Sequence, residues 1–145
     1  MKLNKVTPLP FEIFESLALA KTKEDKIQIL RQNQGFELNT ILMMAFDPKI
    51  VLALPSGSPP YEKDDGDPTE SMNRIATVLR EIPLLLVSDK RLDPIRKETK
   101  FIGILESINF RDAEVLIAAK DKNLEKICPG LTRELVQEAI PGLLR

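Results

Sequence analysis

Residues 93 to 120 read DPIRKETKFIGILESINFRDAEVLIAAK, and they contain two consecutive helix starts. Asp93 places a capping carboxylate before Pro94, a residue suited to the first helical turn. Asn109, followed three residues later by Asp112, repeats the capping signal. Behind the two caps, apolar residues recur at helical spacing, as Ile95, Phe101, Ile102, Leu105 and Ile108 and then as Ala113, Leu116, Ile117 and Ala119. The stretch predicts two short helices joined by a capped turn.

The N-terminal part shows the same pattern of caps and apolar faces. Pro10 precedes an apolar helix face, and Thr22 caps a second segment that ends shortly before Gly35. A third apolar stripe, over residues 38–46, stops where Asp47 precedes Pro48, because the residue before a proline disfavours the helical conformation. These signals predict a helix before Thr22 and two more before Pro48.

Two further helix starts follow, one in the middle of the chain and one near its end. Asp67-Pro68-Thr69-Glu70 combines a cap, a first-turn proline and an acid three residues after the cap. Thr132 caps a last helix, which Pro141-Gly142 ends. The apolar run at residues 50–54 is either a short strand or a helical turn, since periodicity cannot separate the two over so few residues.

These signals predict an all-α protein of one compact domain over residues 1–145. The length suits a single hydrophobic core, and the caps indicate about six or seven short helices. Residues 55–68 are the exception, because their prolines, glycines and acidic residues favour a long exposed loop.

The composition excludes several classes of function. The chain is 43% hydrophobic and 30% charged, which is typical of a globular protein, and its net charge of −1 provides no global attraction to nucleic acid. The longest apolar runs are far shorter than the roughly 20 residues that cross a bilayer, so no membrane association is expected. Cys128, the lone cysteine, cannot form an internal disulfide, which agrees with a reducing compartment such as the cytoplasm.

No catalytic or metal-binding motif is convincing. Histidine is absent, which removes the commonest general base and the commonest zinc ligand. Lys63-Asp64-Asp65-Gly66 has the Lys-x-Asp-Gly form of nucleotidyltransferases, but it lies in the loop and is better interpreted as solvated. Asp67 and Glu70 are explained by helix capping rather than by a divalent cation. The expectation is a protein without enzymatic activity, cofactor, metal or small-molecule substrate.

Basic residues gather in two places that could contact phosphates. The candidates are Lys97 and Lys100 in one cluster and Lys120, Lys122 and Lys126 in the other. Acidic residues are interleaved with both clusters, as Asp89, Asp93, Glu98, Asp121 and Glu125, and this pattern is more typical of an ordinary solvated helix face.

The C-terminal third is similar to a known helical domain. Residues 113–121, AEVLIAAKD, followed by residues 124–131, LEKICPGL, resemble the N-terminal DNA-binding domain of phage ATP-dependent DNA ligases. In that domain a helix ending in a basic-acidic pair leads into a segment that closes with Pro-Gly-Leu. The resemblance implies a ligase-type helical fold standing without the catalytic domains of a ligase.

A second resemblance extends over nearly the whole chain. Its motifs are Ala45-Phe46-Asp47-Pro48, Leu54-Pro55-x-Gly57, Pro59-Pro60-Tyr61, Lys120-Asp121-Lys122, Gly130-Leu131-Thr132, Leu135-Val136 and Pro141-Gly142-Leu143-Leu144. They resemble an uncharacterised family of small proteins from T4-like tailed phages, including cyanophages. This resemblance implies a bacteriophage protein but brings no activity with it.

Two classes of function follow from these resemblances. The first is a non-enzymatic phage accessory protein that binds duplex DNA or a DNA-processing complex through the five candidate lysines. The alternative is a virion structural or assembly protein, or a host-takeover factor, that acts through protein-protein contacts with phage or host partners. The expected location is the host cytoplasm, or the virion in the structural alternative.

Overall fold

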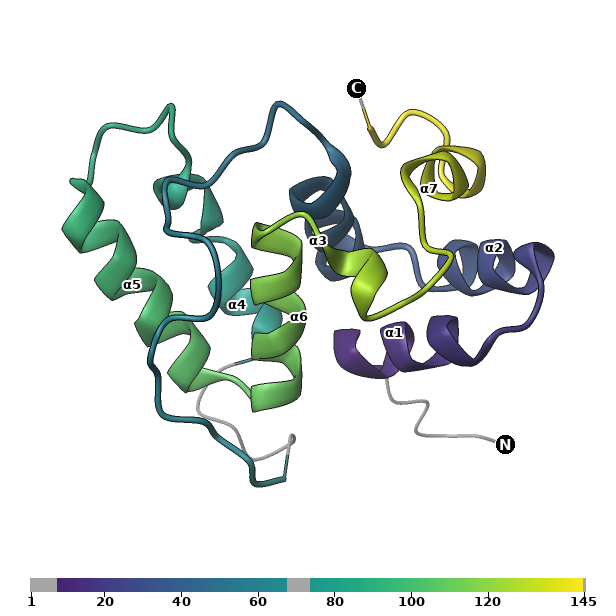
Figure 1. The fold of residues 1–145 in the computed structure, drawn as a ribbon, viewed down its shortest axis with the longest axis horizontal. Coiled ribbons are helices and arrows are strands. Elements are labelled where there is room, and N and C mark those ends of the chain that lie inside the picture. The colour runs from purple at the N-terminus through teal and green to yellow at the C-terminus, as the bar shows by residue number, and fades with distance from the viewer. Residues whose placement is uncertain (1–7, 68–73, 145) are drawn as a thin grey trace.

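The computed structural model describes residues 8–67 and 74–144, and every regular element in these ranges is a helix. The α-helices are α1 (Pro10–Leu19), α2 (Lys23–Gln32), α3 (Phe36–Phe46), α4 (Ile75–Leu79), α5 (Pro94–Ser107), α6 (Phe110–Lys120) and α7 (Arg133–Ala139), with the short 3₁₀ helices η2 (Ile82–Leu85) and η3 (Leu124–Lys126) (Figure 1). The predicted all-α class is confirmed.

The predicted caps account for where four helices begin. The Thr22 hydroxyl accepts a hydrogen bond from the Asp25 amide at the start of α2. Asp93, Asn109 and Thr132 accept equivalent bonds at the starts of α5, α6 and α7. Each bond satisfies one of the amides that an α-helix leaves without a partner in its first turn. The start predicted at residues 67–70 lies, apart from Asp67, outside the described residues.

Two details differ from the sequence patterns. The apolar pattern behind the Asp93 cap includes Ile95, but its side chain, in the first turn of α5, is 76% exposed. Residues 50–54 form neither a helix nor a strand. Instead Leu52 pairs with Leu86 in an isolated antiparallel bridge, with Val87 N–H donating to the Val51 carbonyl at 2.9 Å.

The helices pack around α6. Figure 1 shows α6 in the middle of the molecule, and it contacts α1, α3 and α5, while α2 packs against α7. The buried side chains form one cluster that draws on all seven α-helices, so the described residues make a single compact domain. Its largest fully buried side chains are two phenylalanines, Phe14 and Phe101, and otherwise leucines and isoleucines.

The segment 55–67 is held against the helices although most of its side chains are exposed. The Gly57 amide donates to a carboxylate oxygen of Asp121 at 2.9 Å, and the Phe110 amide donates to the Asp64 carbonyl at 2.9 Å. The backbone of this segment therefore finds partners at the two ends of α6.

None of the helices in the described ranges has the length and apolar run that a bilayer crossing requires.

A buried carboxylate joins α1 to α6. Asp112 is 3% exposed, and its Oδ1 accepts a hydrogen bond from the Phe11 amide at 2.9 Å. Burial raises the pKa of Asp112 to about 6, because it disfavours the charged form more than the Phe11 N–H favours it, and the Glu12 charge adds to the rise.

The raised pKa of Asp112 predicts that stability falls as the pH rises. A carboxyl group whose pKa is higher in the folded state gives a contribution that is complete below its unfolded pKa and is lost as the pH passes through about 6. Between pH 4 and pH 7 the expected loss in free energy of unfolding is about 2 kcal/mol. Asp112→Asn should remove this dependence while its side-chain oxygen still accepts from Phe11. Urea denaturation at several pH values measures the free energy of unfolding of the parent protein and of Asp112→Asn.

Glu125→Gln is the matched control, because it removes one exposed negative charge and leaves the hydrogen bond between Asp112 and Phe11 in place. Its pH dependence should follow the parent protein. Asp89 does not interfere, since hydrogen bonds from Arg91 hold its pKa at about 2, so its contribution changes only at lower pH. A parent protein whose stability is level or rises from pH 4 to pH 7 would contradict the assignment.

Candidate functional site

Lys97, one of the five candidate lysines, is a buried residue of α5. It is 4% exposed, and its ammonium donates to the carbonyls of Leu86 and Asp89, each at 2.6 Å. It therefore ties the start of α5 to the chain that leaves η2. The interleaved charges predict a solvated side chain, and for Lys97 this prediction is wrong. The charge pattern does not indicate the backbone carbonyls of Leu86 and Asp89 that its ammonium binds.

Lys120 at the end of α6 holds the beginning of the 55–67 segment. Its ammonium donates to the carbonyls of Pro55 at 2.8 Å and Gly57 at 3.1 Å, and it pairs with the Asp121 carboxylate at 2.6 Å. The side chain is only 3% exposed. The Lys120-Asp121 pair thus fixes the start of the 55–67 segment, because the lysine donates to two carbonyls there and the Asp121 carboxylate accepts from the Gly57 amide.

Lys122 caps the end of α3. Its ammonium donates to the carbonyls of Met44 at 2.7 Å and Asp47 at 3.0 Å, two groups that α3 itself cannot satisfy. The residue has a positive φ of 57°, which turns the chain away from α6. Burial lowers the pKa of Lys122, and the Asp47 carboxylate opposes this effect.

The remaining two candidates are closer to solvent. Lys100 on α5 forms a salt bridge with Glu81 at 2.8 Å, and both side chains are partly exposed. Lys126 in η3 is exposed and has no partner among the described residues. Of the five lysines, therefore, four have ammonium groups engaged within the chain, and the structure does not gather them on one free basic face.

The other motifs singled out in the sequence have structural roles. The Lys63 ammonium lies 5.9 Å from the centroid of the Phe110 ring, and the Gly66 amide donates to the Asp64 side chain. The Cys128 thiol donates to the Phe14 carbonyl at 3.0 Å, and burial raises its pKa to about 11, so the reactive thiolate is disfavoured. Within residues 8–67 and 74–144, no three acids or cysteines are placed to share a metal ion.

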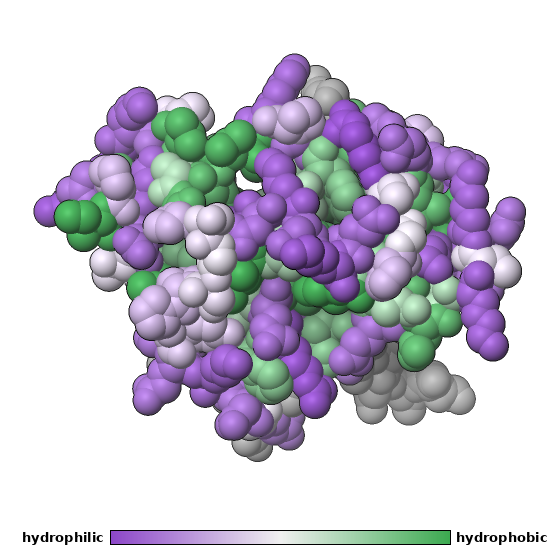
Figure 2. Space-filling view, viewed as in Figure 1, coloured by the Kyte–Doolittle hydropathy of each residue, from purple (hydrophilic) through white to green (hydrophobic). Residues whose placement is uncertain are grey.

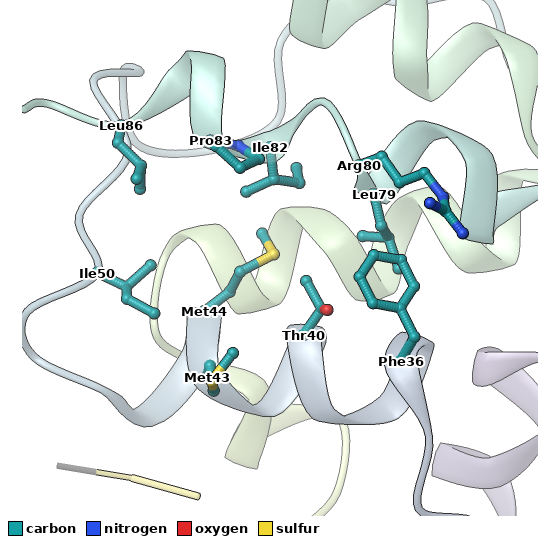
Figure 3. Close-up of a pocket in the computed structure, with 10 residues that line it drawn as sticks. All are labelled: Phe36, Thr40, Met43, Met44, Ile50, Leu79, Arg80, Ile82, Pro83 and Leu86. Atoms are coloured by element: carbon teal, nitrogen blue, oxygen red, sulfur yellow. The ribbon is translucent and has the colours of Figure 1, made fainter. Parts of the chain in front are cut away.

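An apolar groove lies between α3 and the α4 to η2 segment. Its volume is about 400 Å³, in the range of ligand and peptide sites. In Figure 3 the α3 side chains form one wall and the residues of α4 and η2 the other. The lining residues are Phe36, Thr40, Met43, Met44, Ile50, Leu79, Arg80, Ile82, Pro83 and Leu86. We refer to these ten residues as the α3 groove.

The surface of the α3 groove is almost wholly apolar. Arg80 is its one charged lining residue, and its guanidinium lies 5.4 Å from the centroid of the Phe36 ring, a cation-π distance. Phe36 is 46% exposed, and Val51 and Val87, next in the chain to lining residues, are 46% and 48% exposed. Figure 2 shows such hydrophobic side chains reaching the surface over the segments that follow α3 and η2.

One feature of the sequence points to this groove, namely apolar residues of α3 outside its core-facing stripe. The pattern over residues 38–46 assigned one apolar stripe to α3, yet the helix also carries Phe36, Met43 and Met44 outside that stripe. A short helix that is apolar on more than one face has more hydrophobic surface than one core contact covers. The apolar pattern of α3 does not predict the opposite wall of the groove, because that wall comes from residues 79–86.

The placement of Lys122 predicts a role in stability. Lys122→Met keeps the aliphatic stem but leaves the Met44 carbonyl without its donor and the Asp47 carbonyl with only the Ile50 amide, so we expect a loss of about 1–3 kcal/mol in free energy of unfolding. Lys126→Met removes an exposed charge and should change stability by less than about 0.5 kcal/mol. Chemical denaturation compares the two. Equal stability of both variants with the parent would contradict the capping role.

The α3 groove lies entirely within the part of the chain that can be assigned to a family. No curated protein matches the chain. The model of a family of unknown function, DUF6433, matches residues 13–126, from α1 to η3, and leaves α7 outside. Because this range covers most of the chain, the protein belongs to the family of unknown function DUF6433.

Proposed function

We propose that this chain is a non-enzymatic binding protein and that it holds a short amphipathic segment of a partner protein in the α3 groove. The single observation behind the proposal is the chemistry of the lining. Methionine, leucine, isoleucine and phenylalanine side chains form its walls, and flexible methionines adapt well to apolar partners. The lining contains no carboxylate or thiol that could serve as a general base or nucleophile.

Exposed apolar side chains in the groove and next to its lining residues support a macromolecular occupant. Phe36, which lines the groove, is 46% exposed. Val51 and Val87 are joined by a backbone hydrogen bond and are also exposed, next in the chain to Ile50 and Leu86. Exposed apolar surface at a concave site marks places where another molecule is bound. A partner that fills the groove would remove the Phe36 ring from water.

DNA binding, the first hypothesis from the sequence, has weaker support. Phosphate contacts by Lys97, Lys120 or Lys122 would compete with hydrogen bonds of 2.6 to 3.1 Å that these ammonium groups already make. Salt-dependent DNA affinity requires cations that are free to replace counterions. The resemblances to ligase domains and to small proteins of T4-like phages remain a reason to test DNA. In this proposal they make a phage or host protein the expected partner.

The groove proposal predicts that an apolar helical peptide binds in the micromolar range. The probe is an alanine-based peptide of about twelve residues with three leucines on one face, measured by fluorescence anisotropy. Met43→Glu should abolish binding, because it places a charge in the apolar wall. Leu19→Glu should leave binding unchanged, since Leu19 is 79% exposed and does not line the groove.

A titration with nicked duplex DNA at low salt separates the two hypotheses. We expect no binding. Binding with a logarithmic salt slope of roughly −4 to −5, together with no binding of the peptide, would replace the groove proposal by contacts from about five basic residues.

A further inference from the structure

We propose that Arg80 selects the occupant of the α3 groove, which is a two-turn amphipathic helix with a carboxylate beside Phe36. This inference rests on the proposed function and specifies the partner's chemistry. It follows from the length of the groove, from its polarity and from the lack of a strand edge within residues 8–67 and 74–144.

The length of the groove matches about two turns of helix. On α3 its lining runs from Phe36 to Met44, eight residues apart, which corresponds to about 12 Å at 1.5 Å per residue. A partner helix of that length presents three apolar side chains at positions i, i+3 or i+4, and i+7. An added strand would need a sheet edge, and the described residues contain isolated bridges but no strand.

The two ends of the groove differ in charge. In Figure 3 the Arg80 side chain lies beside Phe36 at one end, while Ile50 and Leu86 lie at the other. Arg80 has no carboxylate partner among the described residues. The adjacent acid, Glu81, is already paired with Lys100 at 2.8 Å. Among the described residues, therefore, no acid pairs with the positive charge at the Phe36 end of the groove.

Other charges near the groove do not reverse this polarity. Glu37 follows Phe36 in the chain and Lys49 precedes Ile50, but neither side chain lines the groove or pairs with Arg80. A carboxylate on the occupant would complete an arrangement in which Arg80 contacts an aromatic ring and an acid together. A lysine at that position would meet a like charge.

The test uses leucine peptides that differ only in one flanking residue. Each is an alanine-based helix of about twelve residues with three leucines on one face, and glutamate, glutamine or lysine one turn before the first or after the last leucine. Carbon-13 labelling of the methionine methyl groups reports the site, because two of the four methionines of the chain, Met43 and Met44, line the groove. Each peptide is titrated into the parent protein, into Arg80→Gln and into the matched control Arg74→Gln, and the methyl signals are followed.

The glutamate peptide should bind about three- to fivefold more tightly than the glutamine peptide, and the lysine peptide more weakly by a similar factor. The order should be lost in Arg80→Gln, kept in Arg74→Gln, and reduced at high salt because screening weakens exposed ion pairs. The signals of Met43 and Met44 should shift in each titration.

Three results would overturn the inference. Equal binding of all peptides, with shifts of Met43 and Met44, would leave the groove function intact but remove the role of Arg80. No shift with any peptide would refute both proposals. Shifts with decanoate but with no peptide would assign the groove to small apolar carboxylates instead of a partner helix.

Discussion

The carbonyl groups at the ends of short helices are the constraint on which the rest of this structure depends. The α-helices have five to fourteen residues, and each leaves its last carbonyls without donors from the same helix. Basic side chains from other segments supply those donors. Lys122 and Arg133 reach the end of α3, Arg31 reaches the Glu138 and Ala139 carbonyls at the end of α7, and Lys26 reaches Ala20 after α1.

This use of basic residues decides how much charge is available to a partner. Each of these bonds joins two segments that are distant in the chain or separated by a turn, so it fixes tertiary structure as well as a helix end. Lys97 and Lys120 likewise donate to backbone carbonyls, Lys97 in the segment after η2 and Lys120 in the segment after residue 54. A chain with 21 basic residues therefore has fewer free cations than its composition suggests. In the proposed function, a partner contacts apolar surface instead.

The α3 groove exists because α3 is covered on only part of its circumference. Leu38, Ile41 and Leu42 are buried in the core, whereas Phe36 and Met43 are left between the walls. The opposite wall cannot close over them. After α4 ends at Leu79, the chain passes into η2, where Pro83 lacks the amide that a continuing α-helix requires. A longer helix there could lie along α3 and fill the space.

The sequence by itself determined the helices, because their signals are local. A cap and the amide it binds are two or three residues apart, as in Thr22 with Asp25 or Asn109 with Arg111, and an apolar stripe repeats within one helix. Only the tertiary structure decided what the lysines bind and where the groove lies. The ammonium of Lys122 and its acceptor on Met44 are 78 residues apart, and the groove joins residues 36–50 with residues 79–86. No periodic or capping pattern extends over such separations, since these contacts follow from how the helices pack.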